Sequence, residues 1–101
     1  LHRLLSSVSD RSVKSEITSI SDPLGKATAL AGKTYVKEGT EEAGFIAQEV
    51  EGVFDIAVSE MEELKGLSYQ SFHALWAESI KELKSENDRL RARLDDLESK
   101  V

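Results

Sequence analysis

The chain of 101 residues has no cysteine, one proline and few aromatic residues, namely one tryptophan, two tyrosines and three phenylalanines. The absence of cysteine excludes a disulfide framework and any metal site built on thiolates. No apolar run approaches the roughly 20 residues of a membrane-spanning helix. The 13 basic side chains are outnumbered by 19 acidic ones and form no stripe of the kind that binds nucleic acid or anionic lipid. We therefore expect no nucleic-acid partner, no membrane partner, and no metal or other cofactor.

Hydrophobic residues make up 40% of the sequence, and only 6% of all residues are aromatic. A single chain of about 100 residues buries only about two-thirds of the surface of its unfolded state. Because so few of the apolar side chains are large rings, we do not expect a large core within one chain. Association with other copies is expected to supply part of the stability.

The last third of the chain carries the clearest pattern, a 3-4 repeat of apolar residues without proline or glycine over residues 67–101. Position a of the heptad falls on His73, Ile80, Asn87, Leu94 and Val101, and position d on Trp76, Leu83, Leu90 and Leu97. In parallel strands in register, Glu86 would face Arg91, and Arg93 would face Glu98, which are attractive pairs. The sequence therefore predicts a long helix over 67–101 that forms a parallel coiled coil.

A helix with an apolar stripe can instead pack on its own domain. The upstream sequence has too few apolar residues to cover a helix of about 45 Å, at 1.5 Å per residue, so self-association is favoured. Packing rules leave the number of strands open. Isoleucine at a, leucine at d and Asn87 at a favour two strands, whereas His73 and Trp76 break that pattern near the globular part. Asn87 is expected to fix the register, and Trp76 and Phe72 are interpreted as core residues.

Short strands and helices are predicted upstream of this helix, which makes the fold class α+β. Asp22 as N-cap, Pro23 as the first helical residue and Gly32 as the stop predict a short helix near 22–31. Residues 9–20 allow a helical face, which their serines and threonines weaken.

Two hairpins are expected between these segments and the long helix. The predicted elements are strands 34–36 and 44–46 around a turn at 38–42, a helix of a turn or two within 47–54, and strands 56–58 and 67–69 around the acidic loop 59–66.

A hydroxyl and an amine lie five residues apart near the N-terminus, on Ser9 and Lys14. Such a pair can act as nucleophile and base when the lysine is desolvated, because burial frees its lone pair to take the serine proton. The spacing alone is weak evidence, since both residue types are common on protein surfaces. A more specific signal is needed.

Three motifs supply that signal. They are Ser9-Asp10 followed by Lys14 and Ile17, then Gly44-Phe45-Ile46-Ala47-Gln48-Glu49-Val50, and then Ala77-Glu78-Ser79-Ile80-Lys81-Glu82-Leu83-Lys84. In this order and spacing, the sequence resembles the intramolecular chaperone auto-processing domain, the peptidase S74 family of phage endosialidases, tail spikes and tail fibres. The resemblance runs from Ser9 to about Leu97, and residues 44–50 are its most specific part.

The resemblance implies a chaperone that brings three polypeptides together, helps the upstream spike or fibre to fold, and then releases itself. The family cuts before the serine of its Ser-Asp motif, here the Val8–Ser9 bond, with a Ser-Lys dyad that maps onto Ser9 and Lys14. The implied parts are 1–8 as the end of the parent fibre, 9–66 as the auto-processing and chaperone region, and 67–101 as the trimerising helix. The implied trimer interface comprises Trp76, Ile80, Leu83, Asn87, Leu90, Leu94 and Leu97.

Further motif residues are expected to support this region, namely Asp10, Gly44, Gln48 and Glu49. For Gln48 and Glu49 two interpretations stay open: they hold the Ser9–Lys14 region or a neighbouring subunit, or they cap a short helix. His73 is interpreted as a helix residue rather than a base.

The sequence departs from the family pattern at two positions. Ser12 stands where the family has arginine, and Asp55, which follows Phe54, stands where the family usually has proline. The resemblance places the protein in the host cytoplasm during phage assembly, with the released domain absent from the virion. Two alternatives are a chaperone of the same fold that does not cut, and a plain coiled-coil oligomerisation domain.

Overall fold

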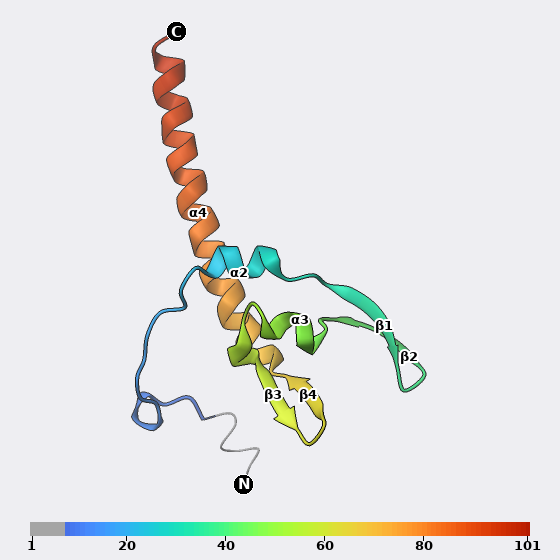
Figure 1. The fold of residues 1–101 in the computed structure, drawn as a ribbon. Helices are drawn as coiled ribbons and strands as arrows, with labels where there is room; N and C mark the ends of the chain where they lie inside the picture. Colours follow the sequence, from blue (N-terminus) through green and yellow to red (C-terminus); the bar gives the residue numbers. More distant parts are fainter. Residues whose placement is uncertain (1–7) are drawn as a thin grey trace.

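The computed structural model describes residues 8–101 (Figure 1). Its elements are the 3-10 helix η1 (Arg11–Val13), α2 (Pro23–Ala29), β1 (Lys33–Lys37), β2 (Thr40–Gly44), α3 (Ala47–Glu51), the 3-10 helix η2 (Asp55–Ala57), β3 (Val58–Met61), β4 (Leu64–Leu67) and α4 (Tyr69–Ser99). Two short hairpins and short helices thus precede one long helix, and the predicted α+β class is confirmed. Within residues 8–101, no helix is both long enough and apolar enough to cross a membrane.

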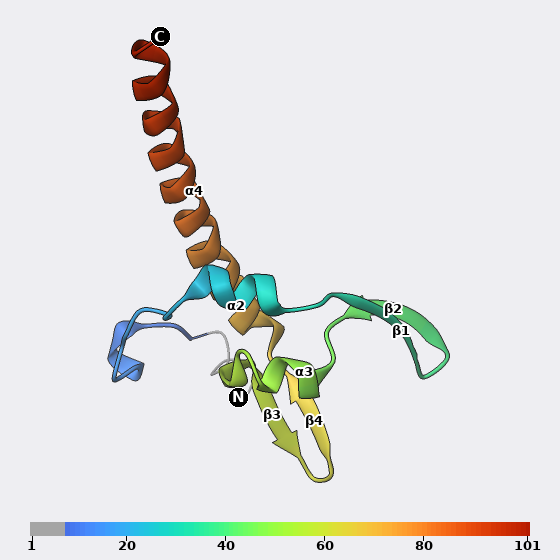
Figure 2. The ribbon, with the colours of Figure 1, turned by 45° about the horizontal axis from the view of Figure 1, so that its top comes forward.

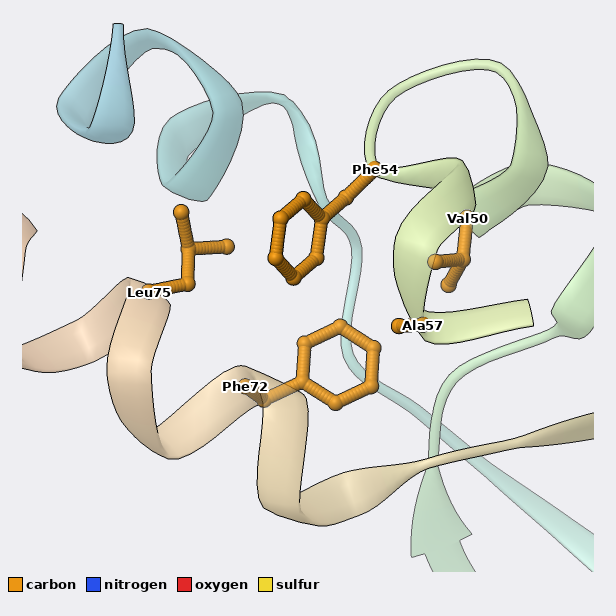
Figure 3. Packing of buried hydrophobic residues seen from close by; sticks show 5 residues of the cluster. All are labelled: Val50, Phe54, Ala57, Phe72 and Leu75. Carbon is orange, nitrogen blue, oxygen red and sulfur yellow. The ribbon is translucent and has the colours of Figure 1, made fainter. Parts of the chain in front are cut away.

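A small hydrophobic hub joins these elements. Its buried members are Val50, Phe54, Ala57, Phe72 and Leu75. The first three come from the α3–η2 segment and the last two from the first turns of α4, as Figure 3 shows. The expectation of a small core within one chain therefore agrees with the structure.

The aromatic residues are concentrated in this hub around one side chain, Phe72. Its ring centroid lies 5.0 Å from that of Phe45, 5.8 Å from Tyr69, 5.9 Å from Trp76 and 6.0 Å from Phe54. These separations are typical of favourable aromatic pairs. These aromatic rings thus lie together where β2, η2 and α4 meet. Their packing fixes the start of α4 against its own domain.

The first hairpin differs from its predicted form. Strand β1 pairs with β2 from Lys33 opposite Gly44 to Lys37 opposite Thr40, and the turn is only Glu38–Gly39. Both turn residues have positive φ, 52° and 79°, as a two-residue hairpin turn of the tightest kind requires. The prediction of a turn at 38–42 and a strand at 44–46 was therefore wrong, because glycine at the second turn position lets pairing resume at once.

The second hairpin is also tighter than predicted. Strands β3 and β4 pair from Val58 opposite Leu67 to Met61 opposite Leu64, which leaves a turn of two residues. The prediction of a loop at 59–66 was wrong. Glu60 lies exposed on β3 and forms an ion pair with Lys65, which is opposite it on β4, whereas Glu62 and Glu63 form the turn.

Helix α2 lies across α4 and is held there by two polar contacts (Figure 1). The Ser79 hydroxyl lies 2.7 Å from the carbonyl oxygen of Leu75 and 3.0 Å from that of Pro23. The backbone N–H of Leu24 donates to Glu82 Oε1 at 3.2 Å, where a carboxylate also complements the helix dipole. Asp22 is the N-cap residue of α2, as predicted, but it has a left-handed backbone and makes no side-chain cap bond.

Helix α2 ends at Ala29, three residues before the predicted stop at Gly32. The N-terminal prediction also changes: residues 9–20 carry only the three-residue η1 in otherwise irregular backbone, with a positive φ of 52° at Glu16. Serines and threonines disfavour helix because their side chains offer the backbone other hydrogen bonds. The N-terminal segment thus runs as an arm away from the hub (Figures 1 and 2).

The shape of the chain is open. Its radius of gyration is 18.7 Å and its extents are 63 × 40 × 21 Å, whereas a compact domain of this length has a radius of gyration of about 13 Å. The arm, the two hairpins and the upper half of α4 all project from the hub (Figures 1 and 2). Such a shape exposes much surface for contacts with other chains.

Candidate functional site

The arm brings the predicted serine and lysine together. Lys14 Nζ donates a hydrogen bond to Ser9 Oγ at 2.5 Å. The carbonyl group of Val8, the residue before Ser9, belongs to the peptide bond that Ser9 Oγ would attack. Hydroxyl, amine and candidate scissile bond thus all lie within seven residues of one chain.

Local hydrogen bonds make this contact possible. The Asp10 carbonyl accepts from Val13 N–H, and the Arg11 carbonyl accepts from Lys14 N–H, both at 3.1 Å. The Asp10 carboxylate oxygen Oδ1 accepts from the Ser12 N–H at 2.9 Å and from the Ser12 hydroxyl at 2.6 Å. Both hydrogen bonds from Ser12 hold the pKa of Asp10 below its ordinary value, and the bond from the hydroxyl has the larger effect. Asp10 is therefore ionised at neutral pH.

Ser9 and Lys14 are both exposed, as are all residues from Val8 to Ser19. A lysine amine accepts a proton only in its neutral form, and removal from water favours that form. In a single chain the arm lies to one side of α2 and α4, away from the first hairpin (Figures 1 and 2). The geometry for proton transfer is present in one chain, whereas the desolvated surroundings are not.

The other predicted motif residues lie at the hub, apart from the arm. Glu49 Oε2 forms an ion pair of 2.9 Å with Lys33 Nζ, which ties α3 to the start of β1. Gln48 lines a groove of about 700 Å³ that residues of both hairpins also line. Within one chain neither residue is brought to Ser9 or Lys14, and neither makes a side-chain cap bond at the start of α3.

Gly44 has a packing role that the sequence did not reveal. A side chain at this position would place its Cβ 2.7 Å from the Tyr35 hydroxyl and 2.8 Å from the Tyr69 hydroxyl. The hydrogen bond between these two hydroxyls, together with partial burial, raises the pKa of Tyr35. Glycine thus leaves room for a tyrosine pair that connects β1 to the start of α4.

The predicted interface residues of α4 are accessible above the hub. Ile80 is 64% exposed, and Leu83, Leu90, Leu94 and Leu97 are each about half exposed. We call these five residues, with Asn87, the α4 stripe. Trp76 belongs to a different environment, because it is partly buried against the hub. The stripe is accordingly an apolar surface without a partner in the described part of its own chain.

The described residues contain no group of three or more histidine, aspartate or glutamate side chains that could hold a metal ion. Sequence reasoning missed the Tyr35–Tyr69 pair and the Ser79 and Glu82 contacts to α2. For Ser79 and Glu82 the signal was their place within the motif at 77–84, whereas both tyrosines lie outside the motifs at 44–50 and 77–84.

The model of the family described as chaperone of endosialidase, Peptidase_S74, matches residues 9–59. The chain belongs to this family. Among curated proteins, no match to the chain is found. Domains of the S74 family are of the self-cleaving serine peptidase type, and the match begins at Ser9, the residue after the candidate scissile bond.

Proposed function

We propose that this S74 domain is the C-terminal intramolecular chaperone of a phage tail spike or fibre, and that it releases itself by cutting the Val8–Ser9 bond. One observation carries the proposal: the family match begins at Ser9, whose Oγ accepts a hydrogen bond from Lys14 Nζ at 2.5 Å. The upstream part of the same polypeptide is the substrate of both activities. Assembly takes place in the host cytoplasm.

The proposed cut proceeds in two steps. Neutral Lys14 takes the proton from Ser9 Oγ as the oxygen attacks the Val8 carbonyl carbon, and the same amine then protonates the departing Ser9 nitrogen. The C–N bond breaks and an ester joins Val8 to Ser9 Oγ. Water hydrolyses this ester to a Val8 carboxylate and the free Ser9 hydroxyl. No metal or cofactor takes part in the proposed reaction.

Trimerisation is proposed to occur through the α4 stripe. Three copies of α4 in parallel would bury the exposed leucines against one another, with Asn87 at the shared axis fixing the register. In the same arrangement Glu86 faces Arg91, and Arg93 faces Glu98, across neighbouring helices. Surfaces from neighbouring chains then cover the exposed arm, which favours the neutral form of Lys14 and makes the cut depend on assembly.

Intact mass spectrometry of freshly expressed chain tests the cut. We expect a product that begins at Ser9, and we expect Ser9→Ala to abolish it. Lys14→Arg should also abolish it, because guanidinium keeps the charge but does not give up its proton. Ser15→Ala and Lys26→Arg are matched controls that should leave the cut unchanged. A wild-type trimer that stays intact would contradict the proposed autoproteolysis.

A chaperone of the same fold that does not cut is the second candidate function. The exposure of Ser9 and Lys14 in one chain favours this candidate. The presence of Ser12 where the family has arginine favours it as well. An uncut trimer that still improves folding of the upstream fibre would support this candidate. A trimer without effect on fibre folding would indicate a plain coiled-coil domain.

A further inference from the structure

The contact between Ser9 and Lys14 does not follow from their spacing. Five residues of extended chain span roughly 17 Å at about 3.3 Å per residue. The chain must therefore turn back between them, and η1 is that turn. This 3-10 helix has three residues and buries none of them, so hydrophobic packing within one chain does not stabilise it. Local hydrogen bonds carry the turn.

Asp10 contributes twice to these bonds. Its carbonyl oxygen accepts from Val13 N–H at 3.1 Å, and its Oδ1 accepts both hydrogens offered by Ser12, from the backbone at 2.9 Å and from the hydroxyl at 2.6 Å. The side chain thus caps the same turn that the backbone closes. Two residues beyond Ser12, the Lys14 side chain returns to Ser9 Oγ.

A direct catalytic role for Asp10 fits the geometry less well. The bonds from Ser12 favour its ionised form, which has no proton to give. Among residues 8–101, the structure records no hydrogen bond from Ser9 or Lys14 to its carboxylate. The carboxylate therefore faces the turn and not the reacting groups.

We infer that Asp10 is a positioning residue for the cut: as N-cap of η1 it holds the turn that carries Lys14 to Ser9, with Ser12 as the donor that completes the cap. This inference rests on the proposed autoproteolysis. Ser12 serves this cap through both its backbone N–H and its hydroxyl.

The test compares Asp10→Asn with Asp10→Ala in the full chain. Asparagine is as good an N-cap as aspartate, whereas alanine is a poor one. We expect the first-order rate of appearance of the Ser9 product to stay within about threefold in Asp10→Asn and to fall about tenfold in Asp10→Ala. Ser12→Ala keeps the backbone donor, so its rate should lie between the rates of Asp10→Asn and Asp10→Ala. Sedimentation should show unchanged trimers in all three variants, which separates positioning from a general loss of folding.

Two rate outcomes would overturn the inference. A rate in Asp10→Asn as low as in Asp10→Ala would assign the effect to charge rather than to capping. An unchanged rate in Asp10→Ala would remove the role altogether.

A second readout keeps the inference testable if the wild type does not cut. Nuclear Overhauser contacts between the Ser9 β protons and the Lys14 ε protons report the turn directly. We expect them in the wild type and in Asp10→Asn, and expect their loss in Asp10→Ala. Contacts that persist in Asp10→Ala would overturn the inference, whereas an uncut wild type would overturn only the proposed autoproteolysis.

Discussion

The lower and upper halves of α4 have similar apolar residues in very different surroundings. In the lower half, Phe72 is 2% and Leu75 0% exposed, because the α3–η2 segment packs on them. In the upper half, Leu90 and Leu94 are 55% and 54% exposed. At 3.6 residues per turn, Leu90 lies five full turns above Phe72 on the same side of the helix, so the hub contact and the α4 stripe are separated along the helix and not around it. One helix can therefore serve its own domain and other chains at once.

The largest expected effect comes from the upper half. Leu83→Asp combined with Leu90→Asp would place six carboxylates in the proposed trimer seam. The free-energy cost of burying these unpaired charges exceeds the stabilisation from the remaining helix contacts. We expect a monomer by analytical ultracentrifugation and no cut at Val8–Ser9. The hub should keep its fold, because neither leucine belongs to the core cluster.

A matched control puts the same two charges on the opposite face of α4. Ser85→Asp combined with Ala92→Asp should leave the trimer and the cut intact, since both residues occupy the outer heptad position. A Leu83→Asp, Leu90→Asp variant that is monomeric yet cuts at the full rate would break the link between assembly and cleavage.

A smaller effect is expected from the lower half. Phe72→Ala removes the ring on which the hub rings pack and should cost about 3–5 kcal/mol of the free energy of unfolding. Urea unfolding followed by Trp76 fluorescence, at fixed protein concentration, measures the loss. Val36→Ala, at a side chain that is 71% exposed, should change stability by no more than about 0.5 kcal/mol. Equal losses in the two variants would mean that the hub is not the stabilising core.

The smallest of the three effects concerns the tyrosine pair at the start of α4. Gly44→Ala would bring a methyl group into steric overlap with the hydroxyls of Tyr35 and Tyr69. We expect it to lower the free energy of unfolding by about 1–3 kcal/mol. Displacing the hydroxyls should also lower the pKa of Tyr35 towards its ordinary value, which ultraviolet titration detects. Gly32→Ala is the control, because nothing lies within 4 Å of its added Cβ. Tyr35→Phe with Tyr69→Phe should relieve the cost of Gly44→Ala, and a cost that stays unchanged would contradict the proposed clash.

The sequence predicted features that depend on local repetition. The heptads located α4, because apolar residues at fixed spacing define a helix face whatever surrounds it. The number of hairpins was predicted correctly, but their bounds were not. The residue type at position 38 does not indicate the positive φ that Glu38 adopts in the turn. The residue pair Ser9 and Lys14 was visible as spacing, but the turn that joins them depends on the Asp10 cap.

Contacts between distant segments were beyond sequence reasoning. The sequence analysis named Glu82 only as part of the motif at 77–84, and only the fold places it at the start of α2. Gly44 was expected to support the motif region, and only the fold puts two tyrosines over it. These contacts require that the hub already exists, and no periodicity encodes them.

The local turn at Ser9 has a consequence for the products of a cut. Because the hydroxyl and the amine both lie on the C-terminal side of the Val8–Ser9 bond, they would depart together on the discarded fragment. The fibre that remains would end in a carboxylate and carry neither group, so it could not hydrolyse a second bond. Each polypeptide could then be processed only once, and the finished fibre would be chemically inert at its new end.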